Sequence, residues 1–325
     1  MNGSFAVSIG PHIKDKISTK RVMWAVVLAL LPAGAAGVFI FGLNSLAVIA
    51  AGTISAVATE MAILAIRKKD IWAIRDGSAV LTGLLLAYNL PPNVPVWLPV
   101  AGSFFAIAVA KQAFGGLGHN IFNPALAGRA FLMISWPALM TTWQNPRWQV
   151  HAVTSATPLV FAKGGGEFAG TGTVSYRDLF IGNHGGCIGE VCVAALLAGA
   201  AYLFIKKYIT WRIPATYIAT VALLSWIFNG TKGLFTGDAL FFALAGGLAL
   251  GAFFMATDYV TSPISNKGKI IFGFGCGALT FLIRKFSGYP EGVSYAILIM
   301  NAAVPLIDRY TFPKWFGWSP APKRG

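Results

Sequence analysis

Long apolar stretches alternate with short polar segments along almost the whole chain. A helix needs about 17–25 predominantly apolar residues to cross a bilayer, and most of the stretches approach that length. The pattern therefore predicts an all-α polytopic membrane protein of about ten transmembrane helices. The stretches fall at 22–42, 45–66, 77–90, 96–113, 121–140, 188–205, 213–229, 239–257, 270–283 and 293–308.

Composition agrees with this prediction. Hydrophobic residues make up 56% of the 325 residues and charged residues only 11%, against about 25% charged in an ordinary soluble domain. This excludes a soluble globule, and disorder is excluded because disordered segments combine low hydrophobicity with high charge. The run 22–42 is too long for the core of a signal peptide and lacks a small-residue cleavage site after it, so we expect a first membrane helix.

The net charge of +14 is distributed unevenly between the two sides of the predicted membrane. Eighteen of the 25 Lys and Arg residues fall on one side and six on the other, with Arg129 left over. Basic loops stay in the cytoplasm, so the pattern predicts cytoplasmic termini and an external loop over 141–187. In such a protein the basic charge indicates topology and contact with lipid, and we expect no nucleic-acid partner.

The two sets of five predicted helices begin on opposite sides of the membrane, as two inverted repeats require. Polar segments with Pro or Gly end apolar runs at 88–95, 115–124, 257–266 and 287–292. Such breaks free backbone groups that need partners, which favours a central site between broken helices, although ordinary interfacial loops would look the same. The expected units are a cytoplasmic segment 1–21, a first repeat 22–140, an external loop 141–187, a second repeat 188–308 and a cytoplasmic tail 309–325.

Few residues suggest chemistry without further information. The four histidines are scattered and the three cysteines form no C-x-x-C pair, so we expect no metal site. Intramembrane carboxylates are functional candidates by default, which singles out Glu60, Glu190 and Asp258. Glu60 and Asp258 lie near the cytoplasmic face, however, where they could be solvated or paired with Lys and Arg.

Three motifs, in their order along the chain, carry a family resemblance. They read G-H-N-I-F-N-P-A-L-A-G-R (118–129), V-T-S-A-T-P-L (153–159) and T-D-Y-V-T-S-P (257–263), and G-Y-P-E-G-V-S-Y-A-I-L-I-M-N (288–301) follows them. With them the chain resembles, from about residue 10 to 313, the D subunits of Rnf complexes, which are ion-translocating ferredoxin:NAD+ oxidoreductases. It is also similar to the B subunits of sodium-translocating NADH:quinone reductases.

The resemblance implies a covalent flavin at Thr157. In this family a threonine in an S-G-A-T type motif carries FMN through a phosphoester, and here the motif reads T-S-A-T, with Ser155 and Ala156 at the small positions. A flavin transferase, which is the expected partner in maturation, needs an accessible hydroxyl. Small residues and Pro158 suit an exposed turn, so we expect Thr157 to be accessible.

The resemblance further implies a second flavin, riboflavin-like and non-covalent, which we expect near Asn120, Asn123 and the segment from Asp258 to Ser262. Amides, hydroxyls and freed backbone groups there could hydrogen-bond an isoalloxazine edge. Alternatively, Asn123 and Pro124 simply cap the fifth apolar helix.

The resemblance implies the function of a flavoprotein subunit of a redox-driven Na+ or H+ pump, inserted in a bacterial or archaeal cytoplasmic membrane. Such a subunit would not be active alone, because ferredoxin and NAD would bind other subunits of the complex. On the fold alone a passive channel or transporter remains the alternative, since inverted repeats with broken helices are a transporter architecture.

Overall fold

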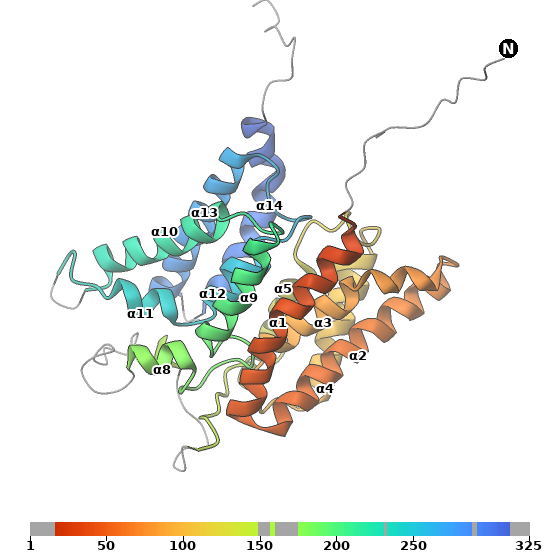
Figure 1. Cartoon of the computed structure of the whole chain (residues 1–325), viewed down its shortest axis with the longest axis horizontal. Helices are drawn as coiled ribbons and strands as arrows, with labels where there is room; N and C mark the ends of the chain where they lie inside the picture. Colours follow the sequence, from red (N-terminus) through yellow and green to blue (C-terminus); the bar gives the residue numbers. More distant parts are fainter. Residues whose placement is uncertain (1–16, 149–156, 160–174, 231–232, 288–290, 313–325) are drawn as a thin grey trace, which may run out of the picture.

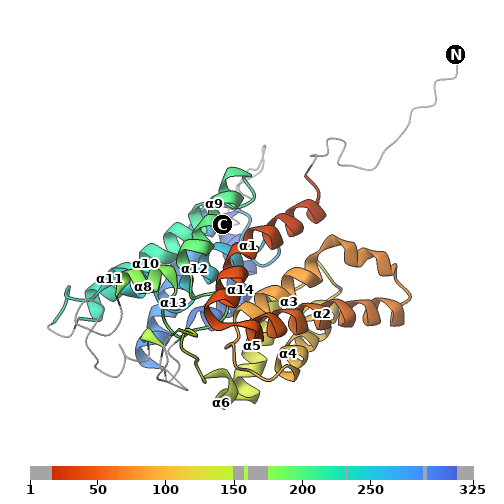
Figure 2. The ribbon, with the colours of Figure 1, turned by 60° about the horizontal axis from the view of Figure 1, so that its bottom comes forward.

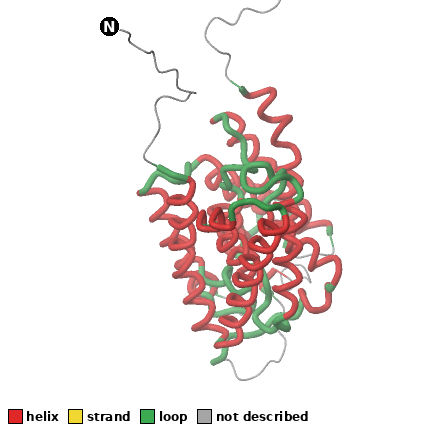
Figure 3. Tube along the Cα trace, turned by 90° about the vertical axis from the view of Figure 1, so that its right-hand side faces the viewer, coloured by secondary structure: helices red, strands yellow, loops and turns green. Residues whose placement is uncertain are grey.

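The computed structural model describes residues 17–148, 157–159, 175–230, 233–287 and 291–312. Helices and their connecting loops make up this part of the chain, and within it no β-strand is found (Figure 3). The predicted all-α class is therefore confirmed.

Two helices at the start of the chain are each long and apolar enough to cross a membrane, namely α1 (Thr19–Phe41) and α2 (Leu43–Ile66). Ser18 begins α1, because its side chain accepts a hydrogen bond from the backbone N–H of Arg21. Gly42 separates the two helices with a φ of +93°, a conformation that favours glycine. The chain can therefore reverse direction between α1 and α2 within a single residue.

The other predicted apolar stretches also contain helix. The first half continues with η1 (Ile71–Asp76), α3 (Ser78–Tyr88), α4 (Trp97–Ile107), the π-helical turn η2 (Ala108–Gln112), α5 (Pro124–Ser135) and α6 (Pro137–Met140). The second half contains α8 (Tyr176–Ile181), α9 (Val193–Ile205), α10 (Arg212–Phe228), α11 (Ala239–Leu244), α12 (Leu248–Leu250), the π-helical turn η3 (Gly251–Met255), α13 (Asn266–Phe286) and α14 (Val293–Thr311).

The stretch 239–257 differs from the continuous helix that its apolar character predicts. It is interrupted between α11 and α12, where Gly246 and Gly247 have φ values of +72° and +68°. Only glycine adopts this left-handed conformation readily, so the two glycines break a segment that hydropathy alone treats as one helix.

The helices form two groups with matching packing partners, red to yellow and green to blue in Figures 1 and 2. In the first group α2 packs against α3 and α4, and α4 packs against α5. In the second, α10 packs against α11 and α13, and α13 packs against α14. The groups meet where α1 lies along α9, and a Cβ added at Gly199 of α9 would overlap the carbonyl oxygen of Ala29 in α1. This joint therefore depends on the absence of a side chain.

Apolar side chains cover much of the outer surface of the helices. Leu28, Phe39 and Ile54 are 54%, 64% and 67% exposed, and less than a quarter of the most apolar window of α2 is buried. Exposed apolar area of this extent is unfavourable in water and suits a lipid environment.

The first and last helices of the described chain have their outer ends on the same side, because α1 begins and α14 ends at the same end of the molecule, the upper end in Figure 1. An even number of crossings requires this arrangement.

Candidate functional site

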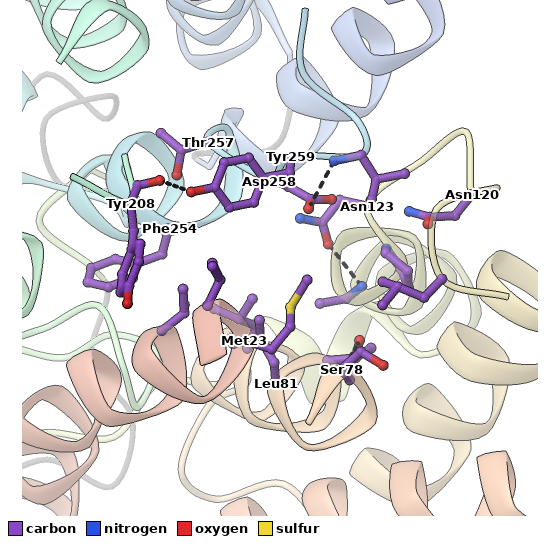
Figure 4. A pocket seen from close by; sticks show the side chains of 18 of the residues that line it. Met23, Ser78, Leu81, Asn120, Asn123, Tyr208, Phe254, Thr257, Asp258 and Tyr259 are labelled. Carbon is purple, nitrogen blue, oxygen red and sulfur yellow. Dashed lines mark hydrogen bonds between the residues drawn. The ribbon is translucent and has the colours of Figure 1, made fainter. Parts of the chain in front are cut away.

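A pocket lies between the two groups of helices, at the end of the molecule where α1 begins. The space around it that no atom fills is about 750 Å³ and includes open solvent, whereas the cavity itself has a volume of about 70 Å³. That cavity is smaller than the range of about 300–1,000 Å³ for ligand pockets, so a larger ligand would have to move the lining side chains apart. Most of its lining is apolar. In Figure 4 the side chains of Asn120, Asn123 and Asp258 lie along one side, and those of Met23, Leu81 and Ser78 along the side opposite.

Asn123 has a structural role in the wall of this pocket. Its Oδ1 accepts hydrogen bonds from the backbone N–H groups of Ala125 and Leu126 and so caps α5, with Pro124 in the first turn. Its Nδ2 donates to the carbonyl oxygen of Met255 at 3.3 Å, at the end of η3. Asn123 therefore caps the helix, as one of the two sequence interpretations has it, and also joins the two groups of helices at the pocket.

Asn120 has an unused hydrogen-bond acceptor. Its Nδ2 donates to the carbonyl oxygen of Phe122 at 3.0 Å, while its buried Oδ1 has no partner within the described part of the chain. A buried amide oxygen without a partner costs free energy, so an N–H donor on a bound ligand would relieve that penalty. A flavin ring carries such a donor at its N3 position, so the polar groups of the pocket match this ligand. The ring would enter only with movement of the apolar side chains that line the cavity.

Asp258 lies just after η3. Its Oδ2 accepts a hydrogen bond from the Thr261 hydroxyl at 3.0 Å, and its Oδ1 is 3.4 Å from the backbone N–H of Val260. Burial raises the pKa of the Asp258 carboxyl, and these hydrogen bonds oppose the shift in part. Ser262 is not among the lining residues. The structure thus brings Asn120, Asn123 and Asp258 to one pocket and leaves Ser262 outside it.

Sequence reasoning missed one charged residue of this pocket, Lys111. The charge pattern places it among the basic residues on the cytoplasmic side, whereas it is 1% exposed, lines the pocket and forms an ion pair with Glu60. Glu60 is therefore paired, but with Lys111 and not with the nearby Arg67. A lysine and a glutamate within two apolar stretches were the signal that could have suggested the pair.

Thr157 lies outside this pocket and is not in the exposed turn that the sequence predicts. It is 4% exposed, and its Oγ1 has no hydrogen-bond partner in the described segments. The residue two positions later, Leu159, is buried directly against Gly246, at the break between α11 and α12. This apolar contact holds the segment inward. The neighbouring motif residues Ser155 and Ala156 lie outside the described residues.

A second cluster of buried charges lies beside the same break. Arg129 of α5 pairs with Glu291, which precedes α14, and also donates to Asn89 Oδ1 at 2.7 Å and Ser294 Oγ at 3.0 Å. A Cβ added at Gly247 would overlap Glu190 Oε2, which has no partner among the described residues.

The sequence predicted no metal site, yet three possible ligand atoms lie within 4.8 Å of one another in this cluster, on Cys187, Glu190 and Glu291. The guanidinium of Arg129 lies against two of these side chains, through its ion pair with Glu291 and a 3.7 Å contact with Cys187 Sγ. A cation placed there would meet a positive charge that the protein itself provides.

Comparison with known proteins identifies the family. Residues 6–317 match the NQR2, RnfD, RnfE family. The chain is 52% identical over 320 residues to the D subunit of the proton-translocating ferredoxin:NAD(+) oxidoreductase complex of Clostridium ljungdahlii, covering 96% of each chain.

Two further relatives give the same result. The chain is 49% identical over 318 residues to the D subunit of the Na(+)-translocating ferredoxin:NAD(+) oxidoreductase complex of Acetobacterium woodii, covering 97% of this chain and 96% of that one. It is 39% identical over 330 residues to the D subunit of the ion-translocating oxidoreductase complex of Stutzerimonas stutzeri, covering 92% of each. The predicted resemblance is confirmed, and the chain belongs to the NQR2, RnfD, RnfE family of membrane subunits.

Proposed function

We propose that this chain is the D subunit of an ion-translocating ferredoxin:NAD+ oxidoreductase complex and carries electrons on two flavins within the membrane. The proposal rests on family membership, which covers almost the whole chain, and on near full-length similarity to two subunits of that name. One of these relatives is named for protons and the other for Na+, so either ion fits. Ferredoxin and NAD would bind other subunits of the complex.

The second, non-covalent flavin belongs in the pocket between the two groups of helices. The observation that carries this assignment is the convergence of Asn120, Asn123 and Asp258, with a buried Asn120 Oδ1 that lacks a partner in the described chain. In this assignment Asn120 accepts a hydrogen bond from the ring, while Asn123 and Asp258 are held by their own contacts. A bound flavin would supply the redox chemistry, and the protein would orient the ring and exclude water around it.

Thr157 would carry FMN through a phosphoester on its Oγ1. That oxygen is buried without a partner in the described segments, so the flavin transferase must act while the segment around Thr157 is open. The phosphate and the ring would then lie at the outer aqueous boundary, where desolvation of the charge costs least.

The proposed topology has ten crossings in two inverted halves, cytoplasmic termini and an external 141–187 loop. The matching packing partners of the two groups support the repeat, and the shared end of α1 and α14 supports an even number of crossings. Labelling of single cysteines in intact cells tests it, with Arg177→Cys expected outside and Lys69→Cys inside. Labelling of Lys69→Cys but not Arg177→Cys in intact cells would reverse the orientation.

The flavin content of the purified complex tests the proposed function. Denaturation should release one flavin from this subunit and leave one attached, and mass spectrometry should place the attached flavin at Thr157. Thr157→Ala should remove the attached flavin only. Asn120→Ala should reduce the released flavin, whereas Ser262→Ala, outside the pocket, should leave it unchanged. A colourless subunit that transports a solute would instead support the alternative of a passive channel.

A further inference from the structure

The pocket has a buried positive charge in its wall. Lys111 lies in the π-helical turn η2, is 1% exposed and lines the pocket together with Ser78. Single π-helical turns occur frequently at functional sites. A lysine is almost never buried to this extent unless it is paired, so the residues that hold it determine what it can do.

The ammonium group of Lys111 uses all three of its donors. Its Nζ donates to Glu60 Oε1 at 2.7 Å, to Glu60 Oε2 at 2.8 Å and to Ser78 Oγ at 2.6 Å. Gln112 Nε2 donates to Glu60 Oε1 at 2.8 Å, and the Ser78 hydroxyl donates in turn to Asp76 Oδ1 at 2.8 Å. The charge is therefore fixed in position by bonds from several elements.

The ion pair is not symmetric about the pocket. Lys111 and Ser78 are among its lining residues, whereas Glu60 on α2 is not. The pair thus forms a dipole whose positive end lies in the pocket wall and whose negative end lies behind it. The charged and titratable side chains facing the same space from the other elements are Asp258, Tyr208 and Tyr259.

A buried ion pair is weak evidence for a role in stability. Taking an ammonium and a carboxylate out of water is expensive, and replacement of a buried ion pair by apolar residues is often neutral or stabilising. A positive charge at the wall of a low-dielectric pocket does, however, act strongly on the charge of a ligand. The placement of Lys111 therefore suggests an electrostatic role toward whatever the pocket binds.

We infer that Lys111 raises the electron affinity of the flavin that the pocket binds, by favouring its reduced, more negatively charged form. The inference rests on the proposed function, because it requires a flavin in this pocket. A flavin that takes up two electrons and one proton becomes an anion, and charges placed near its ring are a known means of tuning it. Glu60, which does not line the pocket, and Ser78, which does, hold the ammonium of Lys111 in place.

The test is redox titration of the non-covalent flavin in the full chain, with Thr157→Ala as the common background so that no covalent flavin interferes. Lys111→Met leaves the carboxylate of Glu60 behind the pocket without its positive partner. It should weaken the binding of reduced relative to oxidised flavin on the order of tenfold, which corresponds to roughly 30 mV for a two-electron couple. The midpoint potential should therefore fall.

Two further variants separate charge from structure. Lys111→Arg keeps the charge and should keep the potential near that of the background. The double variant Glu60→Gln with Lys111→Met leaves no buried unpaired charge, so it should fold more readily, and its potential should fall by less than that of Lys111→Met. Glu291→Gln, in the other buried ion pair and away from this pocket, is the matched control and should not move the potential.

The order of the potentials decides the outcome. If the flavin is bound and all variants titrate at the potential of the background, Lys111 has only a structural role and the inference is wrong, while the proposed function stands. If the unmodified complex releases no flavin from this subunit on denaturation, the proposed function fails and the inference fails with it.

Discussion

Two buried ion pairs in the described part of the chain differ in how completely their atoms are bonded. Lys111 and Glu60 belong to the first group of helices, and each of their charged atoms has a partner. Arg129 and Glu291 join the two groups, and there Glu291 Oε1 and the nearby Glu190 Oε2 have no partner in the described residues. We call the Lys111–Glu60 pair closed, because every charged atom in it has a partner. The Arg129–Glu291 pair lies in a cluster that is incompletely hydrogen-bonded.

The difference indicates different roles. The Lys111–Glu60 pair is held in one arrangement by its hydrogen bonds and provides a fixed electric field. Such a field suits a pocket that binds the oxidised and reduced forms of a ligand with different affinities. The Arg129–Glu291 pair lies near a second cation, Arg284, which donates to the carbonyl oxygen of Ala245, and near a second carboxylate, Glu190. Two carboxylate oxygens of this cluster lack a donor among the described residues, so its arrangement is less constrained than that of the Lys111–Glu60 pair.

The largest predicted loss of stability follows removal of the carboxylate from either ion pair. We expect the greater loss for the Lys111–Glu60 pair. Glu60→Ala takes two of three hydrogen bonds from a buried ammonium and should destabilise the chain by about 3–5 kcal/mol. Glu291→Ala leaves Arg129 bonded to Asn89 and Ser294, so the loss should be nearer about 1.5–3 kcal/mol.

Reversible unfolding of the purified chain in mixed micelles, with increasing SDS, measures both values. Glu60→Gln and Glu291→Gln, which keep an acceptor oxygen, are the matched controls and should each lose less than the alanine variant. A greater loss for Glu291→Ala than for Glu60→Ala would show that the number of remaining partners does not govern these sites.

The sequence predicts a feature of this structure well when the interacting residues are close together along the chain, and poorly when they are far apart. The apolar stretches predicted where helices form, because hydrophobicity is local. The family resemblance, and not the residue pattern alone, led us to expect Asn120, Asn123 and Asp258 at one site, and the structure brings them to one pocket. Lys111 and Glu60 are 51 positions apart, so their pairing requires the tertiary arrangement of α2 and η2. Likewise, small residues around Thr157 predicted an exposed turn, but the burial of Leu159 against Gly246 depends on a distant break in a helix.

An intermediate effect is expected at the joint between the groups. Gly199→Ala places a methyl group against the carbonyl oxygen of Ala29 and must push α1 from α9, which should cost about 1–3 kcal/mol. Gly52→Ala, where the nearest atom to an added Cβ is 3.2 Å away within the first group, is the matched control and should cost less.

Double variants test whether the contact between α1 and α9 is energetically coupled to either ion pair. Arg129 and Glu291 also join the two groups. The double variant Gly199→Ala with Glu291→Ala should therefore lose less unfolding free energy than the sum of the losses in the two single variants. Gly199→Ala with Glu60→Ala should be additive, since the closed pair lies within one group. Additivity in both combinations would mean that the joint and the Arg129 pair act independently.

The smallest predicted effect distinguishes the two serines that bond the cations. Ser294 accepts one hydrogen bond from Arg129 Nη1, which also donates to Asn89, so Ser294→Ala should cost only about 0.5–1.5 kcal/mol. Ser78 accepts from Lys111 and donates to Asp76, and its removal leaves one ammonium donor without a partner, for which about 1–3 kcal/mol is expected. SDS unfolding of Ser294→Ala and Ser78→Ala, each beside its threonine variant, measures the difference. Threonine keeps the hydroxyl, so recovery of stability in Ser78→Thr would assign the loss to the hydrogen bonds. Equal losses in the two alanine variants would contradict the view that only the pair beside the pocket is fully closed.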